Sequence, residues 1–206
     1  MTRARIKAAV VLLAAGLSRR MGERNKLLIE IEGEPLVRRT AKTYLATGAM
    51  VHAVLGHEAE QVRAALAGLS LTFVENPRFA DGQPASVRAG LDSLPDGYDA
   101  VFIALADQAA LTPGDIADLL RTFADGGGDR ILVPYYRGQR GNPAVFPSKI
   151  IREIRASGGN VACRSFIESN PKLTRRYEAQ NDHFVLDIDT PEDLQAFENA
   201  QRPTPS

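Results

Sequence analysis

The sequence is poor in cysteine, in long apolar runs and in excess charge of either sign. Cys163 is its only cysteine, so no internal disulfide can form, and this suits a reducing cytoplasm. No histidine lies near Cys163 in the sequence, which favours a packing role over thiol catalysis. The 25 basic residues balance the 25 acidic ones, which leaves no overall positive field to attract nucleic acid. No segment approaches the ~18 apolar residues of a membrane span. We therefore expect a cytoplasmic protein that binds neither nucleic acid nor membrane.

Several well-known catalytic motifs are also missing. The P-loop motif GxxxxGKS/T is absent, because Gly22 is followed by Glu23 and Lys26 by Leu27. The dinucleotide motif GxGxxG is absent too, since the next glycine after Gly16 is Gly22. There is no HExxH, GxSxG or Ser-His-Asp pattern, and the three histidines lack metal-ligand spacing. P-loop NTPases and nicotinamide-dependent redox enzymes therefore lose their main support.

The most informative segment that is present is VVLLAAGLSRRMGERNK, residues 10–26. Apolar Val10–Leu13 predicts a buried strand, and the small residues Ala14–Gly16 allow a ligand to approach the backbone. Arg20 and Lys26 bring positive charge to the carboxyl end of that strand, where open α/β sheets bind their ligands. The segment favours a phosphate-binding loop, and the alternative is a strand-to-helix turn with solvated arginines.

Strand-like apolar runs alternate with amphipathic segments through most of the chain. This alternation predicts an α/β fold with a mostly parallel sheet covered by helices on both faces. We expect one domain over residues 1–200 and a disordered tail over residues 201–206. The expected strands are Ala8–Leu13, Val51–Leu55, Leu71–Glu75, Ala100–Ala104 and Arg130–Pro134. The expected helices are Leu36–Thr47, Glu58–Ala67, Ser86–Leu94, Pro113–Phe123, Ile150–Ser157, Val161–Asn170 and Pro191–Asn199. Thr112 and Thr190 have the sequence context of helix N-caps.

Three carboxylates follow extended segments. Asp107 ends an apolar strand, and one or two carboxylates together with phosphate oxygens are typical ligands of Mg²⁺. Asp187 and Asp189 alternate just before a helix, so on an extended segment they point the same way. The alternative for Asp107 is a helix cap, and for the later pair a capping network in the first helical turn.

Two polar segments are candidate binding loops. In the first, residues 76–90, Gly82 and Ser86 precede a helix; Ser86 can cap that helix while its hydroxyl and the backbone amides face a ligand. The second, Tyr135–Pro147, is rich in glycine and polar residues and resembles a binding loop more than packed structure.

Taken together, these motifs resemble the MobA-like molybdopterin nucleotidyltransferases, which have a Rossmann-like, glycosyltransferase-A type fold. The resemblance spans residues 8–197 and rests on LAAGLSRRMG at 13–22 with Lys26, LAD at 105–107 and DIDTPED at 187–193. It implies metal ligation by Asp107 and Asp189, catalytic roles for Arg20, Lys26 and Asp107, and acceptor binding by Arg140 and Asn142. The nucleotide-binding residues it implies are Leu13, Ala14, Ala15, Gly16, Arg20, Lys26, Gly82 and Ser86.

Within that family the Ala-Ala-Gly loop, Ser86 with Gly90, and GNPAVF at 141–146 resemble the cytidylyltransferase branch. The resemblance implies Mg²⁺-dependent transfer of CMP from CTP to a molybdopterin-type cofactor, with an acceptor molybdoenzyme as a further partner. Two departures lie near the expected base and acceptor: Asp107-Gln108 is followed by Ala109-Ala110 instead of a proline, and residues 82–86 read GQPAS. Transfer from GTP, a sugar or polyol phosphate acceptor, and a non-catalytic cofactor carrier are therefore the alternatives. A carrier needs no triphosphate or metal site, so Lys26, Asp107 and Asp189 argue against it.

Overall fold

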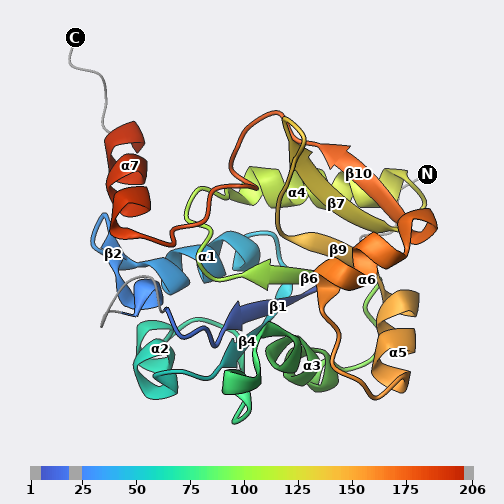
Figure 1. The fold of residues 1–206 in the computed structure, drawn as a ribbon, viewed down its shortest axis with the longest axis horizontal. Helices are drawn as coiled ribbons and strands as arrows, with labels where there is room; N and C mark the ends of the chain where they lie inside the picture. Colours follow the sequence, from blue (N-terminus) through green and yellow to red (C-terminus); the bar gives the residue numbers. More distant parts are fainter. Residues whose placement is uncertain (1–5, 19–24, 202–206) are drawn as a thin grey trace.

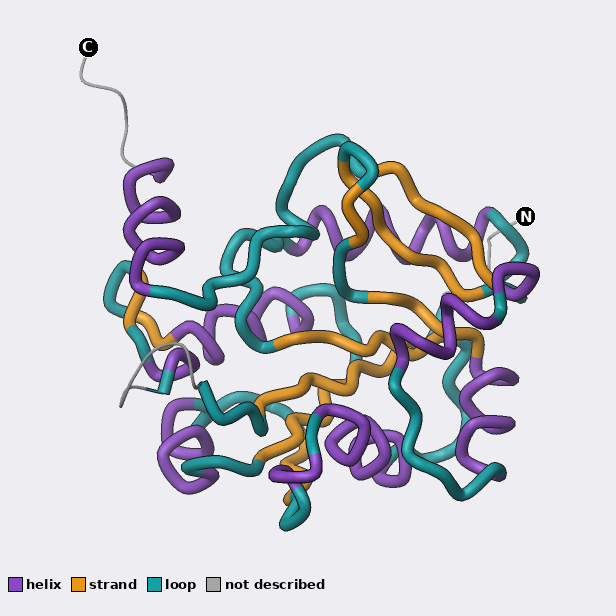
Figure 2. The backbone as a smooth tube through the Cα atoms, in the orientation of Figure 1, coloured by secondary structure: helices purple, strands orange, loops and turns teal. Residues whose placement is uncertain are grey.

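A computed structural model describes residues 6–18 and 25–201, which form a mixed eight-stranded sheet with helices on both faces (Figures 1 and 2). This confirms the expected α/β class. The sheet strands are β1 (Ala8–Ala14), β4 (Met50–Leu55), β5 (Thr72–Glu75), β6 (Ala100–Leu105), β7 (Ile131–Tyr136), β8 (Gln139–Arg140), β9 (Ala144–Pro147) and β10 (Thr174–Glu178). The helices are α1 (Leu36–Leu45), α2 (Ala59–Ala65), α3 (Gln83–Ser93), α4 (Pro113–Asp125), α5 (Ser148–Ala156), α6 (Cys163–Ser169) and α7 (Pro191–Gln201). The short strands β2 (Glu30–Ile31) and β3 (Glu34–Pro35) pair separately.

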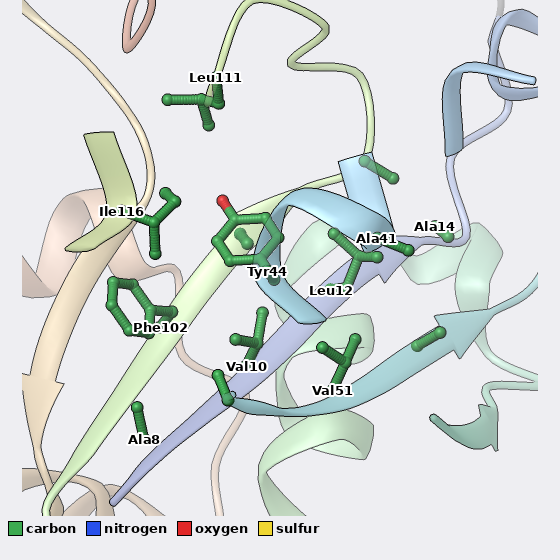
Figure 3. Packing of buried hydrophobic residues seen from close by; sticks show 14 of the residues in the cluster. Ala8, Val10, Leu12, Ala14, Ala41, Tyr44, Val51, Phe102, Leu111 and Ile116 are labelled. Atoms are coloured by element: carbon green, nitrogen blue, oxygen red, sulfur yellow. The ribbon is translucent and has the colours of Figure 1, made fainter. Parts of the chain in front are cut away.

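The central strand β1 is buried on both faces because its side chains alternate between two apolar clusters. Val10 and Leu12 belong to the cluster covered by α1, α2 and α4, whereas Val11 faces the cluster with α3, α5 and α6. In the first cluster Tyr44 of α1 packs on Phe102 of β6, with ring centroids 6.2 Å apart (Figure 3). Burial on both faces explains the continuous apolar runs of the parallel strands.

The strand order β10-β7-β9-β6-β1-β4-β5 reverses beside β1. From β1 the chain goes to β4 and then β5 on one side, and it returns to β6 on the other. All three neighbouring pairs in this half are parallel, so β1 and β6 end at the same edge of the sheet. Open α/β sheets bind ligands at such an edge, where the strand order reverses.

The second half of the sheet differs from the expected binding loop at Tyr135–Pro147. That segment holds the end of β7, all of β8 and all of β9, and β9 is antiparallel to both β6 and β7. The prediction of a loop was wrong because strand pairing with distant segments overrides the local polar and glycine-rich composition. The edge strand β10, parallel to β7, was also missed.

Helix starts follow the predicted signals at two positions. Thr112 caps α4 in a full capping box, with its hydroxyl accepting from the backbone of Asp115. The hydroxyl of Thr190 accepts from the backbone of Asp193 at 3.1 Å at the start of α7. Gln201 is the last residue of α7, and the remaining residues of the expected tail lie outside the described part. No helix within residues 6–18 and 25–201 is long and apolar enough to cross a membrane.

Candidate nucleotide and metal site

The carboxyl ends of β1 and β6 open into a cavity of about 340 Å³. Leu13 of β1 is paired with Leu105 of β6, so the loops after both strands meet there. The expected nucleotide residues that line this cavity are Leu13, Ala15, Gly16, Lys26, Gly82 and Ser86, together with Asp107. Ala14 does not line it, because its side chain is buried in the β1 core. Arg20 lies outside the described residues.

Gly16 leaves the cavity wall open at the backbone. A Cβ atom built on Gly16 would meet no atom of the described residues within 4 Å. Because Gly16 has no side chain, a ligand can use this space beside the backbone, and protein packing loses nothing.

Two polar residues hold the start of the short 3-10 helix Lys26–Leu28: Asn25, at its N-cap, and Ser18, from the loop after β1. The Oδ1 atom of Asn25 accepts from the backbone of Leu27 at 3.1 Å. The Ser18 hydroxyl accepts from the backbone of Lys26 at 3.2 Å and donates to Asn25 at 3.3 Å. These contacts fix the backbone of Lys26 at the mouth of the cavity. Sequence reasoning missed them, although Asn25 is a typical N-cap residue.

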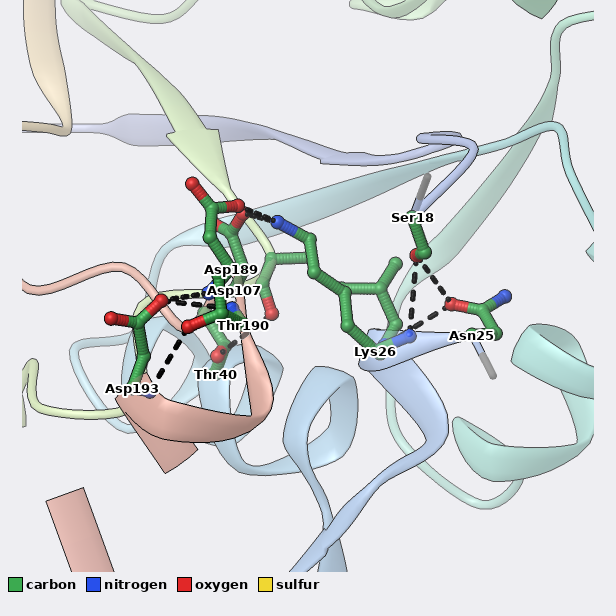
Figure 4. A network of polar contacts seen from close by, with 10 residues as sticks. Ser18, Asn25, Lys26, Thr40, Asp107, Asp189, Thr190 and Asp193 are labelled. Carbon is green, nitrogen blue, oxygen red and sulfur yellow. Dashed lines mark hydrogen bonds and ion pairs between the residues drawn. The ribbon is translucent and has the colours of Figure 1, made fainter. Parts of the chain in front are cut away.

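The Lys26 ammonium lies between two carboxylates that are far apart in the sequence (Figure 4). Its Nζ donates to Oδ2 of Asp107 and, at 2.6 Å, to Oδ1 of Asp189. Two backbone contacts position Asp189: the amide of Ile188 donates to the carbonyl of Asp107 at 3.1 Å, and the amide of Asp189 donates to Asp193 at 3.1 Å. The structure therefore brings Lys26, Asp107 and Asp189 together.

Burial and charge oppose each other in this cluster. Burial disfavours the charged form of Lys26, but Asp107 and Asp189 outweigh it and raise the pKa of Lys26 above its ordinary value. Lys26 is therefore a cation at neutral pH. Burial, followed by the nearby charges of Asp107 and Asp189, raises the pKa of Asp187 to about 7. Asp187 therefore belongs to the same electrostatic cluster.

The donor set fits a hard divalent cation whose coordination is completed by a substrate. Oδ1 of Asp107 and Oδ1 of Asp187 are both buried without a hydrogen-bond partner among the described residues. Buried carboxylate oxygens in that state are costly unless a cation or donor meets them. No group of three or more His, Cys, Asp or Glu side chains in the described ranges is arranged as a complete metal site. Mg²⁺ commonly binds through one or two carboxylates, phosphate oxygens and water.

Ser86 does not cap its helix. Helix α3 begins three residues earlier than expected, at Gln83, with Pro84 in its first turn and Gly82 at the N-cap. The proline is the signal that marks this start. The hydroxyl of Ser86 instead accepts from Nδ2 of Asn76 at 3.0 Å, while Ser86 still lines the cavity.

A second cavity, of about 460 Å³, adjoins the first and shares Gln83 and Leu105 with it. Arg140 and Asn142 line it, as does Asp187. Burial lowers the pKa of Arg140, and its Nε has no hydrogen-bond partner within the described residues. A half-buried guanidinium with an unused donor suits an anionic ligand.

Cys163 also borders the second cavity and packs against the core beneath α5 and α6. Burial raises the pKa of this thiol to about 11, so it stays protonated. The packing role expected from the sequence agrees with this environment.

Gln108 joins three parts of the site, and sequence reasoning missed it. Its side chain is 1% exposed, and its Nε2 donates to the carbonyls of Asn142 at 3.2 Å and Phe184 at 3.1 Å. The amide of Asn142 also donates to the carbonyl of Phe184 at 2.9 Å. Gln108 therefore ties the loop at Asn142 and the segment before Asp189 to the end of β6. The only signal in the sequence is an amide next to Asp107 at the end of an apolar run.

Asp115 anchors the same segment from the side of α4. Its carboxylate accepts from Nδ2 of Asn181 at 3.0 Å and lies 2.8 Å from Nδ1 of His183. Burial acts to raise the pKa of Asp115, but the hydrogen bonds from Asn181, Thr112 and His183 outweigh it and hold the pKa below its ordinary value.

Comparison with known proteins identifies the family of the chain. The family model of the MobA-like NTP transferase domain matches residues 10–177. Nicotine blue oxidoreductase of Paenarthrobacter nicotinovorans is 28% identical over 193 residues, covering 89% of this chain and 93% of that protein. The molybdenum cofactor cytidylyltransferase of Escherichia coli (strain K12) is 24% identical over 185 residues, covering 89% and 92% respectively.

Solved structures share the fold. Rv0371c from Mycobacterium tuberculosis H37Rv superposes with a TM-score of 0.78 at 25% identity, covering 95% of this chain and 100% of that one. A structure of Rv0371C in complex with manganese superposes with a TM-score of 0.74 at 23% identity, covering 94% and 99%. The chain belongs to the MobA-like NTP transferase family, and it is an enzyme of the nucleotidyltransferase type.

Proposed function

We propose that the protein transfers CMP from CTP to the terminal phosphate of a molybdopterin-type cofactor and releases pyrophosphate. The observation that carries this proposal is the meeting of Lys26, Asp107 and Asp189 at the cavity where β1 and β6 end. A cation and a carboxylate pair at an open, glycine-lined edge suit a metal-bound triphosphate.

The protein's own residues supply positioning and charge. Lys26 and Arg20 bind the triphosphate and neutralise the charge that develops on the leaving pyrophosphate. Asp107 and Asp189 hold Mg²⁺, which when bound neutralises phosphate charge and orients the reacting groups. The similarity to a manganese-binding protein supports a divalent metal here. The acceptor phosphate is already an anion, so its attack on the α-phosphorus needs no catalytic base.

The second cavity is the proposed acceptor site. Arg140 and Asn142 face it, and it joins the nucleotide cavity through Gln83 and Leu105. An acceptor phosphate that pairs with Arg140 thereby enters from the side of Asp187 and Asn142. The finished cofactor would then pass to an acceptor molybdoenzyme.

The choice of cytosine rests on two observations. The Ala14-Ala15-Gly16 loop resembles the cytidylyltransferase branch, and the similarity to the Escherichia coli cytidylyltransferase covers 89% of the chain. Transfer from GTP is the competing outcome, with the same fold and the same metal site.

The proposal is tested by measuring pyrophosphate release with each of the four NTPs, with and without molybdopterin cofactor. We expect release with CTP, Mg²⁺ and the cofactor together. Asp107→Asn should reduce release by about 100-fold or more, because it removes a carboxylate that holds the metal. Asp118→Asn is the matched control, since Asp118 is an exposed residue of α4 that pairs with Arg121. Undiminished release in the Asp107 variant refutes the metal assignment, and a preference for GTP refutes the choice of base.

Oxidoreduction is a second candidate, favoured by the 28% identity to nicotine blue oxidoreductase over 89% of the chain. The two functions differ in their products, because nucleotidyl transfer releases pyrophosphate and oxidoreduction does not. Transfer of a hydride from a reduced nicotinamide cofactor to an added quinonoid dye, followed by absorbance in the absence of any NTP, would support the second candidate. A protein that binds molybdopterin cofactor but gives neither product would be a carrier.

A further inference from the structure

The Lys26 ammonium occupies the position between carboxylates that a metal ion would need. It contacts Asp107 and Asp189 at once, and the side chains of Lys26 and Asp107 are each 14% exposed. Oppositely charged groups attract strongly at such a partly dry position, and removing one partner leaves the other buried and unpaired. A divalent cation that binds between Asp107 and Asp189 must therefore compete with the Lys26 ammonium.

The cluster nevertheless has more negative charge than Lys26 balances. One ammonium faces two carboxylates, because Lys26 contacts both Asp107 and Asp189. Asp187 lies two residues before Asp189 in the chain. The Oδ1 atoms of Asp107 and Asp187 are buried and have no hydrogen-bond partner among the described residues, so a cation that reached them would remove an unfavourable state. The cluster is thus held together by Lys26 without being fully neutralised by it.

Lys26 also has space to move without a change in the backbone. Its main chain is fixed by Ser18 and Asn25, but its side chain has four rotatable methylene groups. The cavity it lines holds about 340 Å³, and Gly16 leaves the neighbouring wall open. The ammonium can therefore turn from the carboxylates towards an anion in the cavity.

We propose that the Lys26 ammonium substitutes for the metal ion between Asp107 and Asp189. It leaves this position when a polyphosphate binds in the cavity and attracts the ammonium. Divalent metal alone then binds weakly, and polyphosphate and metal each raise the affinity for the other. Such coupling is reciprocal, because both ligands favour the arrangement in which Lys26 has left the carboxylates. The inference rests on the proposed function in one respect, that the anion in the cavity is a triphosphate.

The first test measures Mn²⁺ binding without any nucleotide, by the electron paramagnetic resonance signal of free Mn²⁺. Lys26→Met removes the ammonium and keeps a side chain of similar length, so we expect its Mn²⁺ affinity to exceed that of the wild type by about tenfold or more. Adding Asp107→Asn to this variant should abolish the gain. Lys42→Met is the matched control, because Lys42 is ion-paired with Glu34 away from the cluster. Equal or weaker Mn²⁺ binding by Lys26→Met overturns the proposal.

A second test uses the wild-type chain and so does not depend on the folding of a variant. Lys26 should react slowly with an acetylating reagent, and saturation with inorganic tripolyphosphate and Mn²⁺ should change its rate, as followed by mass spectrometry. Lys42 serves as the internal reference. Tripolyphosphate itself binds Mn²⁺, and this alone would raise the apparent Mn²⁺ affinity of the protein. In the wild type, the measured rise should be larger than this contribution. In Lys26→Met, the rise should equal this contribution. An unchanged Lys26 rate together with no excess overturns the proposal.

The two proposals fail separately. If Lys26→Met gains Mn²⁺ affinity but no NTP is turned over, the substitute-cation proposal stands and the proposed function fails. If pyrophosphate is released but Lys26→Met gains no Mn²⁺ affinity, the proposed function stands and the substitute-cation proposal fails.

Discussion

Replacement of Gln108 by leucine tests whether one buried amide holds the two halves of the site together. Gln108→Leu removes the donor to the carbonyls of Asn142 and Phe184 while keeping a side chain of similar size. The carbonyl of Phe184 keeps the amide of Asn142 as a donor at 2.9 Å, so the Asn142 carbonyl suffers the larger loss.

The magnitude follows from three contributions. The two lost hydrogen bonds contribute about 1 kcal/mol each, and a buried carbonyl left without its donor costs about 1–3 kcal/mol. Against this, Oε1 of Gln108 is already buried without a partner among the described residues, and leucine removes that cost. The net loss is about 2 kcal/mol of unfolding free energy, which lowers the melting temperature of a chain of this size by about 4–8 °C.

Thermal denaturation and pyrophosphate release check this prediction. Pyrophosphate release should fall even at temperatures where Gln108→Leu is fully folded, because the segment before Asp189 keeps the bond from Ile188 to Asp107 but loses the bond from Gln108 to Phe184. Gln61→Leu, on the exposed surface of α2, should change the unfolding free energy by less than about 0.5 kcal/mol. The reasoning is refuted if Gln108→Leu melts at or above the wild-type temperature, since the unpartnered oxygen would then outweigh both hydrogen bonds.

Three further predictions concern the cavity wall, the core and the anchor of the Asp189 segment. Gly16→Ala should fold at least as stably as the wild type, because its Cβ meets no atom of the described residues within 4 Å, yet raise the KM for the nucleotide in the pyrophosphate assay. Gly90→Ala should lower the unfolding free energy in urea by about 1–3 kcal/mol, because its Cβ would lie 2.2 Å from Cγ1 of Val11; no loss would mean that α3 can move away from β1. Asp115→Asn should be less stable than the wild type at neutral pH. The pKa of Asp115 is lower in the folded state, so this difference should be present above about pH 4 and disappear as the pH falls through the folded-state pKa; a difference that persists in acid contradicts the assignment.

The parallel half of the fold could be predicted from the sequence because burial on both faces leaves a visible pattern. β1 and β6 are continuous apolar runs, β4 is apolar except for His52, and the Thr-Pro starts of α4 and α7 have the expected caps. The antiparallel strand β9 and the charged edge strand β10 were missed. Their strand character depends on pairing with segments that are distant in the sequence.

The candidate site could be predicted in its parts but not in its contacts. Asp107 was found from its place after an apolar strand, and Asp189 from the resemblance to a family. The ion pair between Lys26 and Asp189 joins residues 163 positions apart, and no local pattern signals such a contact. Gln108 was overlooked for a similar reason, since its partners are two backbone carbonyls from distant loops.

The position of Asp189 has a consequence for where this domain can be divided. The family model matches residues 10–177, so it includes the nucleotide cavity, Lys26 and Asp107 but ends before Asp187 and Asp189. A protein shortened to the matched range would keep the cavity wall and half of the carboxylate pair. Asp189 takes its place through the backbone of Ile188 and the cap of α7, so the last helix is a structural part of the site. Exchanging the segment after residue 177 between relatives would also exchange Asp187 and Asp189, two carboxylates of the candidate site.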